Sequence, residues 1–450
     1  MLIACRTTIL RTALVVGLLL TAWPGHAFDI QKVTSPSGIT AWLIEDHSNP
    51  VIAMEMIFDA GAANDPTDKE GLANLLASTL DEGAGELSST DFQSALSEKS
   101  ISLYFRAGTD RFRGIVSTLT ANSDTAFEML RLALHQPRFE AAAVDRIRAQ
   151  IMAKIRSDTQ QPQSRAWRLW LQELFPSHPY GRPRDGTLES VARIDSDDLR
   201  RFAKAGLSRQ GLSIGVVGDI SAERLARVLD QVFADLPAQS SLPPVADQQP
   251  ISDGQIRVID QDIPQSVIVF GHAGIAWGDP DYFGAALLMQ IVSGGFQSRL
   301  VQEVRVKRGL VYGISASLFP RDHSAMVIGS TATRNAKARE TVEIIRAQWR
   351  KMAEQGPTAS EITDAKSYLI GAFPLRFTDS PAIARSLAGF QHLGLGPDYP
   401  NQRAAMINRF TADDLKRIAR RLFQEENLTF TILGRPQDIP AGSRAKSATQ

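Results

Sequence analysis

An internal duplication constrains the fold of this 450-residue chain more than any other feature of its sequence. Residues 51–85 run as an apolar stretch, a polar loop and then a predicted helix, and residues 266–295 repeat that order. Gly71 and Gly284, which we place at the starts of the two predicted helices, lie 213 positions apart. A single domain would give no reason for such a repeat, so the offset indicates two similar halves.

A second pair of landmarks supports the same offset. LSIGVVGDIS at 212–221 resembles FTILGRPQDI at 429–438. The glycines at the ends of these predicted strands, Gly218 and Gly434, lie 216 positions apart. Two landmarks with nearly equal spacing predict a duplication of about 215 residues per half.

The domain boundaries follow from composition. Between the halves, LPAQSSLPPVADQQPISDG carries four prolines and no aromatic residue, which is typical of an extended linker. The closing AGSRAKSATQ is small and polar, which is typical of a frayed end. We predict a signal peptide at 1–27, an N-terminal domain at 28–236, a linker at 237–254, a C-terminal domain at 255–438 and a flexible tail at 439–450.

Within each half, predicted strands come first, long helices follow and one strand closes the unit. This grouping favours an α+β fold in which each half is a largely antiparallel sheet with helices packed on one face. The strand and helix patterns that carry this prediction are strands at 38–44 and 51–58, and helices at 123–135, 140–158, 335–354 and 359–371.

The N-terminus has the three-part layout of a secretory signal. Arg6 and Arg11 precede a short apolar run, and Gly25 and Ala27 provide small residues before a cut at Phe28. We therefore expect a periplasmic or secreted protein without a membrane span after cleavage. An uncleaved anchor is the alternative, although the run is shorter than the roughly 20 residues that span a bilayer.

Charge and cysteine content exclude several classes of protein. Lys and Arg number 49 and Asp and Glu number 49, so the chain lacks the basic excess of a nucleic-acid binder. The single cysteine, Cys5, lies in the predicted signal. The mature chain would therefore hold no disulfide, no cysteine nucleophile and no Cys-zinc site.

Neither a zinc pair nor a nucleophile motif is apparent from spacing. The closest two histidines after the signal, His135 and His178, lie 43 residues apart, whereas a helical zinc pair needs imidazoles three to five residues apart. Serine, histidine and aspartate occur, but nothing in the sequence picks out a catalytic triad, and a phosphate-binding loop motif is absent. A zinc site built from distant histidines stays open, but each lone histidine is more typical of a structural residue.

Residues 61–84, GAANDPTDKEGLANLLASTLDEGA, resemble the opening of the pitrilysin/insulinase family of zinc peptidases. That family carries G-[LT]-A-H-x-x-E-H, an inverted zinc motif, on a helix after such a loop. Aligning Gly71 on the motif's glycine places Asn74 at the first histidine, Ala77 at the catalytic glutamate and Ser78 at the second histidine. Asn74 and Ser78 are poor replacements for imidazoles, and Ala77 cannot activate water.

The family's third zinc ligand is a glutamate, which the resemblance places near 153–155. Residues 146–155 contain no acidic side chain, and Asp145 and Asp158 only flank them. All the residues that would hold and use zinc are therefore missing together. The resemblance implies that this chain binds no metal.

The resemblance covers residues 30–437. The segment HPYGRPRDGTLESVARI at 178–194 is similar to a family segment that forms a loop and a helix start, so we interpret His178 as structural.

The second half keeps its motif. SGGFQSRLVQEVRVKRGLVYGISAS is similar to G-G-x-x-S-R-L-x-x-x-[LV]-R-x-x-x-G-L-x-Y of the family. The resemblance implies that Arg305 and Tyr312 bind the substrate backbone and stabilise the oxyanion, as positioned donors can. Gly309 between them would allow the chain to turn from helix to strand. Arg305 could instead be a solvated charge and Tyr312 an ordinary strand aromatic, and Arg308 is a competing arginine.

A missing zinc motif together with an intact Arg/Tyr pair resembles the non-zinc subunit of the family's heterodimers. The resemblance implies a clam-shell architecture and a partner subunit with HxxEH that brings zinc. Peptide substrate would lie as an added strand on a sheet edge. The alternatives are a catalytically inactive scaffold or peptide-binding homologue, and a self-sufficient peptidase with unconventional ligands.

Overall fold

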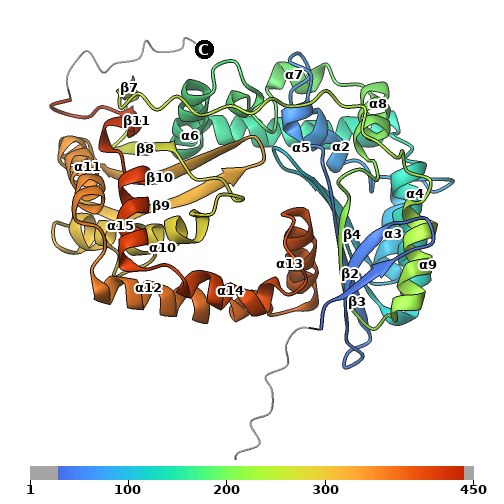
Figure 1. Ribbon diagram of the computed structural model, residues 1–450. Coiled ribbons are helices and arrows are strands. Elements are labelled where there is room, and N and C mark those ends of the chain that lie inside the picture. The colour runs from blue at the N-terminus through green and yellow to red at the C-terminus, as the bar shows by residue number, and fades with distance from the viewer. Residues whose placement is uncertain (1–28, 440–450) are drawn as a thin grey trace, which may run out of the picture.

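The computed structural model describes residues 29–439 (Figure 1). The predicted signal at 1–27 and the predicted tail from residue 440 onward lie outside the described residues. Among residues 29–439, we find no helix with the length and apolar character that crossing a bilayer requires.

The first half contains a six-stranded sheet in the order β1-β2-β6-β3-β5-β4. Only β2 and β6 pair in parallel, and every other neighbouring pair is antiparallel. The strands are β1 (Gln31–Thr34), β2 (Thr40–Glu45), β3 (Val51–Phe58), β4 (Ser102–Ala107), β5 (Phe112–Leu119) and β6 (Ser213–Gly218).

The second half contains a five-stranded sheet in the order β7-β11-β8-β10-β9. In this sheet β7 and β11, the first and last strands of the half, form the only parallel pair, as β2 and β6 do in the first sheet. This order reproduces β2-β6-β3-β5-β4, with β1 as the extra strand of the first half, so the predicted α+β fold with two homologous halves is confirmed. The strands are β7 (Ile256–Asp260), β8 (Gln265–Ala273), β9 (Val311–Arg321), β10 (Ser324–Arg334) and β11 (Thr429–Gly434).

The helices follow a similar order in both halves, although the first half has more of them within residues 29–439. The first half has α2 (Leu72–Ala77), α3 (Ser89–Glu98), α4 (Ser123–His135), α5 (Ala141–Gln160), α6 (Pro162–Leu174), α7 (Leu188–Ala192), α8 (Ser196–Gly206) and α9 (Ala222–Phe233). The second half has α10 (Tyr282–Ser293), a π-helix at Val301–Val306, α11 (Ala338–Gln355), α12 (Ala359–Gly371), α13 (Ser380–His392), α14 (Tyr399–Asn408) and α15 (Ala412–Leu422).

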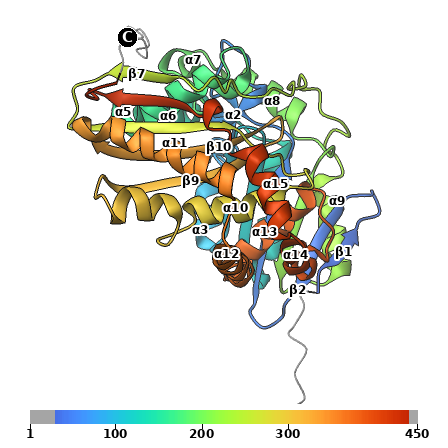
Figure 2. The same cartoon turned by 60° about the vertical axis from the view of Figure 1, so that its left-hand side comes forward.

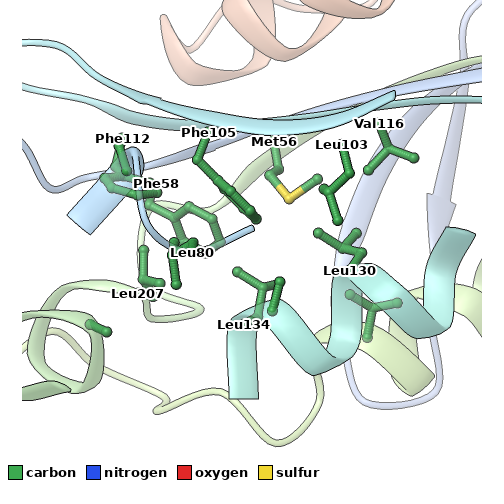
Figure 3. Packing of buried hydrophobic residues seen from close by; sticks show 14 of the residues in the cluster. Met56, Phe58, Leu80, Leu103, Phe105, Phe112, Val116, Leu130, Leu134 and Leu207 are labelled. Carbon is green, nitrogen blue, oxygen red and sulfur yellow. The ribbon is translucent and has the colours of Figure 1, made fainter. Parts of the chain in front are cut away.

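Each half buries one face of its sheet against its own helices. In the first half, alternate strand residues such as Met56 and Phe105 meet Leu130 and Leu134 of α4 in one continuous core (Figure 3). Burial of each such side chain contributes about 1.5–3 kcal/mol. In the second half, α10 contacts β9 and α11 contacts β10 on the corresponding face (Figure 2).

The opposite face of each sheet receives one helix from the other half. Helix α13 packs on β3 and β6 of the first sheet, and α6 packs on β8 and β11 of the second (Figure 1). Glycines allow this close approach, because a Cβ on Gly215 would lie 2.2 Å from the Ala384 carbonyl oxygen and one on Gly271 would lie 2.8 Å from the Trp170 ring. The two halves are therefore joined by an exchange of equivalent helices.

Two details of the predicted helices are wrong. Gly71 does cap α2, but the helix ends at Ala77 and the chain continues in turns rather than in a long helix. Gly284 does not begin its helix, because α10 starts two residues earlier at Tyr282. Gly284 serves packing instead, since a Cβ there would lie 2.4 Å from Ile418 Cδ1.

The segment at 237–254 contains neither helix nor strand and runs along the surface of both halves (Figure 1). Backbone hydrogen bonds hold it in place: the Gln248 amide donates to the His323 carbonyl at 2.9 Å, and the Ile251 amide donates to the Leu174 carbonyl at 3.0 Å. It is thus a bound strap in this structure.

Candidate functional site

Helix α2 is held at its start by a buried aspartate. The Asp65 carboxylate accepts hydrogen bonds from the amides of Gly71 at 2.8 Å and Ala73 at 2.9 Å. Burial raises the pKa of Asp65 to about 7, although the two amides and the nearby Arg182 oppose that shift. The loop and helix frame of the family motif is therefore intact here.

The three motif positions on α2 carry side chains without metal chemistry. Asn74 and Ser78 are one helical turn apart and partly exposed, and the Ser78 hydroxyl donates to the Asn74 carbonyl at 2.9 Å. Ala77, at the position of the catalytic glutamate, is only 2% exposed and lies in the hydrophobic core. The side chains at these three positions therefore contribute to the structure of α2 and its core.

The neighbouring helix α5 supplies no third ligand. It contacts α2, and Ile155 at the end of the 153–155 window is buried in the same core. No group of three or more His, Cys, Asp and Glu side chains in residues 29–439 is arranged to hold a metal ion.

Several histidines have structural partners. The His178 ring accepts from the Tyr180 amide and donates to the Ala246 carbonyl at 2.8 Å, so it ties the linker to the loop before α7. The His272 ring accepts from the Trp349 indole N–H at 2.9 Å, and burial lowers the pKa of His272 to about 4. His178 is thus structural, as predicted.

The structure brings Arg305 and Tyr312 together. Arg305 is an exposed residue of the π-helix, and Tyr312 is the second residue of β9. The Arg305 guanidinium carbon lies 5.3 Å from the Tyr312 ring centroid, in cation–π geometry. Gly309 turns the chain between them with φ of +59°, in the left-handed region that favours glycine.

A β-bulge sets the direction of Tyr312. Thr331 of β10 is paired with Ile314, and Thr333 is paired with Val311, so β9 has one extra residue between these pairs. Such bulges re-aim side chains near functional sites. Because β9 is an edge strand, Tyr312 projects from the rim of the sheet and is 91% exposed.

The two candidate arginines have different environments. Arg308 donates to the Glu303 carboxylate and to its carbonyl oxygen, and Lys307 binds the same carboxylate at 2.6 Å. These two cations hold the pKa of Glu303 below its usual value. Arg305 forms no ion pair within residues 29–439, so its guanidinium stays available for an external acceptor.

A further group of arginines was not predicted. Arg168, Arg182 and Arg321 line a cavity of about 360 Å³ between the two halves, together with residues of the 179–186 loop. Arg182 lies in the segment HPYGRPRDG, whose basic character is visible in the sequence. Nothing local connects it with Arg168 or Arg321, because they meet only in the folded chain.

The sequences of both halves match models of one peptidase family. Residues 40–187 match the family described as Insulinase (Peptidase family M16), and residues 193–369 match the Peptidase M16 inactive domain. A non-peptidase homolog of Helicobacter pylori, YmxG, is 26% identical over 86% of this chain and 90% of its own length. The probable beta subunit of the mitochondrial-processing peptidase of Arabidopsis thaliana is 20% identical over 94% of this chain and 81% of its own.

Solved structures share the fold. A peptidase M16 inactive domain from Pseudomonas fluorescens superimposes with a TM-score of 0.84 at 24% identity, over 91% of this chain and 98% of that one. A protease from Helicobacter pylori superimposes with a TM-score of 0.81 at 17% identity, over 90% of this chain and 100% of that one. These similarities extend across both halves.

Proposed function

The chain belongs to the peptidase M16 (insulinase) family, and from that membership we propose that it is the non-zinc subunit of a secreted heterodimeric metallopeptidase. A homologous subunit with HxxEH would be its partner, and a peptide its substrate. The residues at the zinc-motif positions of α2 do not fit a metal, so zinc is expected on the partner.

One observation carries this proposal: Arg305 and Tyr312 are exposed, stacked and presented from an edge strand. A guanidinium and a phenol both donate hydrogen bonds to a carbonyl oxygen, most strongly as negative charge develops on it. The stacking limits the rotamers of both side chains, which reduces the entropy lost when they bind an oxyanion. A purely structural pair would gain nothing from such exposure.

The proposal is tested by purifying the tagged mature chain from its native envelope and identifying what co-elutes. We expect a near-stoichiometric partner with HxxEH and peptidase activity in the complex. Arg305→Ala and Tyr312→Ala should each lower kcat of the complex by about 10²-fold or more, the usual scale for oxyanion donors. Arg308→Ala is the matched control and should change kcat by no more than about twofold, because exposed ion pairs contribute little.

An inactive scaffold or peptide-binding homologue is the second candidate. The similarity to a non-peptidase homolog favours it. On this hypothesis the chain would be recovered alone or with itself; if it were recovered in an active complex, Arg305→Ala would leave the activity of that complex unchanged. Either result would replace the enzyme-subunit proposal.

A further inference from the structure

The cavity between the two halves collects positive charge that the fold leaves unmatched. Its walls come from α5 and α6, from the 179–186 loop and from the far end of β9, at Phe319 and Arg321. A volume of about 360 Å³ lies at the lower end of the range for small-molecule sites. It accommodates an amino-acid residue rather than a large ligand.

Three of its arginines have no carboxylate partner within residues 29–439. Arg168 forms neither a hydrogen bond nor an ion pair there, and burial next to another cation lowers its pKa. Arg182 donates only to backbone carbonyls, those of Asp65 at 2.9 Å and Ala63 at 3.2 Å. Arg321 stacks on the Tyr180 ring with its guanidinium carbon 4.5 Å from the centroid.

Two of the acidic side chains on the wall are already neutralised. Asp158 binds Lys154 at 2.6 Å. Asp185 binds the same lysine at 2.9 Å and Arg184 at 2.8 Å. These ion pairs leave the other arginines uncompensated.

Three further carboxyl groups lie near the arginines, and one of them is Asp65 beside Arg182, whose pKa burial raises to about 7. Glu70 also lines the cavity, where burial raises its pKa while Arg182 opposes that shift. Asp110 interacts electrostatically with Arg321, and its charge favours the charged guanidinium. Together they offset only part of the charge, so the cavity keeps a positive excess that an anion would balance.

The remaining wall is apolar. Trp167, Leu171, Ile155 and Phe319 line the same space as the arginines. A ligand that suits both surfaces has an anionic end and an apolar or aromatic body. The C-terminal residue of a peptide has both, since its α-carboxylate and side chain leave from one carbon.

A second cavity leads from this one toward Tyr312. The two cavities share Ser164 and Trp167, and the second is lined by Gly313 and Ser315 of β9. Along β9, Gly313 and Phe319 are six residues apart, about 20 Å at the rise of a strand. The two adjoining cavities thus lie against both ends of this stretch of β9, whose length suits an extended segment of about six residues.

We propose that the Arg168–Arg182–Arg321 cavity binds the C-terminal carboxylate of an extended peptide whose preceding residues run along β9 toward Tyr312. The carboxylate would be held by charge-assisted hydrogen bonds from guanidinium groups. That this peptide is also the substrate rests on the proposed function. The anchoring of its C-terminus does not, because every residue of the cavity belongs to this chain.

The test is fluorescence anisotropy of the full mature chain, alone, with an N-terminally labelled octapeptide ending in Phe. The free-acid peptide should bind at least about tenfold more tightly than its C-terminal amide, because the amide removes the charge. Arg168→Gln and Arg321→Gln should each reduce this ratio toward one. Equal binding of acid and amide by the native chain would overturn the proposal.

Arg165→Gln is the matched control, since it removes a charge from the same helix at a residue that lies outside this cavity and binds Gln261 at 3.0 Å. This variant should keep the native preference for the free-acid peptide over the amide. If it lost the preference as much as Arg168→Gln does, the preference would come from the overall positive charge and not from this cavity. A C-terminally amidated octapeptide ending in Glu distinguishes a side-chain carboxylate. Binding of this peptide equal to the free acid would contradict recognition of the C-terminus.

This assay separates the two proposals. If the native chain bound acid and amide peptides equally while Arg305→Ala still lowered kcat of the complex, the C-terminal binding site would be refuted. The proposal of an enzyme subunit would stand. If the chain preferred the free-acid peptide but was purified without a partner subunit, the C-terminal binding site would stand. That result would favour the peptide-binding homologue over the enzyme subunit.

Discussion

Two regions of the chain, helix α2 and the edge of the second sheet, carry the positions of the family's two motifs, and they differ in how their side chains are used. On α2, Ala77 is enclosed in the core and Ser78 bonds back to its own helix. At the edge of the second sheet, Arg305 and Tyr312 are exposed and contact each other. The side chains of the first region serve the packing of the core and of the helix. Those of the second region remain free to donate hydrogen bonds to an acceptor outside the chain.

The difference shows that a backbone motif can persist after the side chains that perform its chemistry have been lost. Gly71 and Asp65 still build the entry to α2, although no metal ligand follows. In the second half, Gly309 and the bulge in β9 build a comparable entry, and the motif residues Arg305 and Tyr312 are present. Backbone geometry alone therefore does not indicate activity.

The largest expected effect concerns the pH dependence of the α2 entry. The pKa of Asp65 is raised from 3.8 to about 7, so its protonated form is favoured in the folded state. Its contribution to the free energy of unfolding is full below pH 4 and is lost as pH rises through 7. At about 1.4 kcal/mol per unit, the loss is about 4 kcal/mol.

Urea unfolding of the native chain and of Asp65→Asn between pH 4 and 8 measures this. The variant should gain stability relative to the native chain as pH rises. A difference that stays constant over this range would mean that Asp65 is charged throughout, and the contrast between the halves would weaken.

The second half should respond to pH in the opposite direction. The pKa of buried His272 is lowered from 6.5 to about 4, so the neutral ring is favoured in the folded state. Its contribution to stability is full above pH 6.5 and is lost as pH falls through 4, by about 3 kcal/mol. Native chain and His272→Gln, compared by urea unfolding at pH 7 and pH 4.5, should differ less at the lower pH. An unchanged difference would contradict a neutral buried ring.

The smallest expected effect compares the two glycines. A Cβ on Gly71 would lie 2.7 Å from the Asp185 carbonyl oxygen, so Gly71→Ala should cost about 3 kcal/mol through strain and overlap. Around Gly309 no atom lies within 4 Å of such a Cβ, so Gly309→Ala should cost about 1 kcal/mol, for its φ alone. Thermal unfolding of both variants checks the ranking, and equal costs would argue against the tighter α2 entry.

Much of the candidate site followed from short stretches of sequence. The loss of ligands at Asn74, Ala77 and Ser78 is a matter of residue type, and the spacing of Arg305 and Tyr312 across Gly309 predicted a helix-to-strand turn that the structure contains. The predicted length of α2 was wrong. The apolar spacing typical of a helix continues past Ala77, but the chain forms turns there and the helix ends. Tertiary packing overrides propensity at such ends.

The sequence by itself determined the duplication, the α+β pattern of each half and the side chains available to each site. These properties depend on residue type and on spacing along a short length of chain. Only the tertiary structure decided the exchange of α6 and α13, the choice of Arg305 over Arg308 as the arginine beside Tyr312, and the gathering of Arg168, Arg182 and Arg321 around one cavity. Arg168 and Arg321 are separated by more than a hundred residues, and no local pattern encodes which distant surfaces pack together. That outcome depends on the complementary fit of whole faces, such as Gly271 against Trp170.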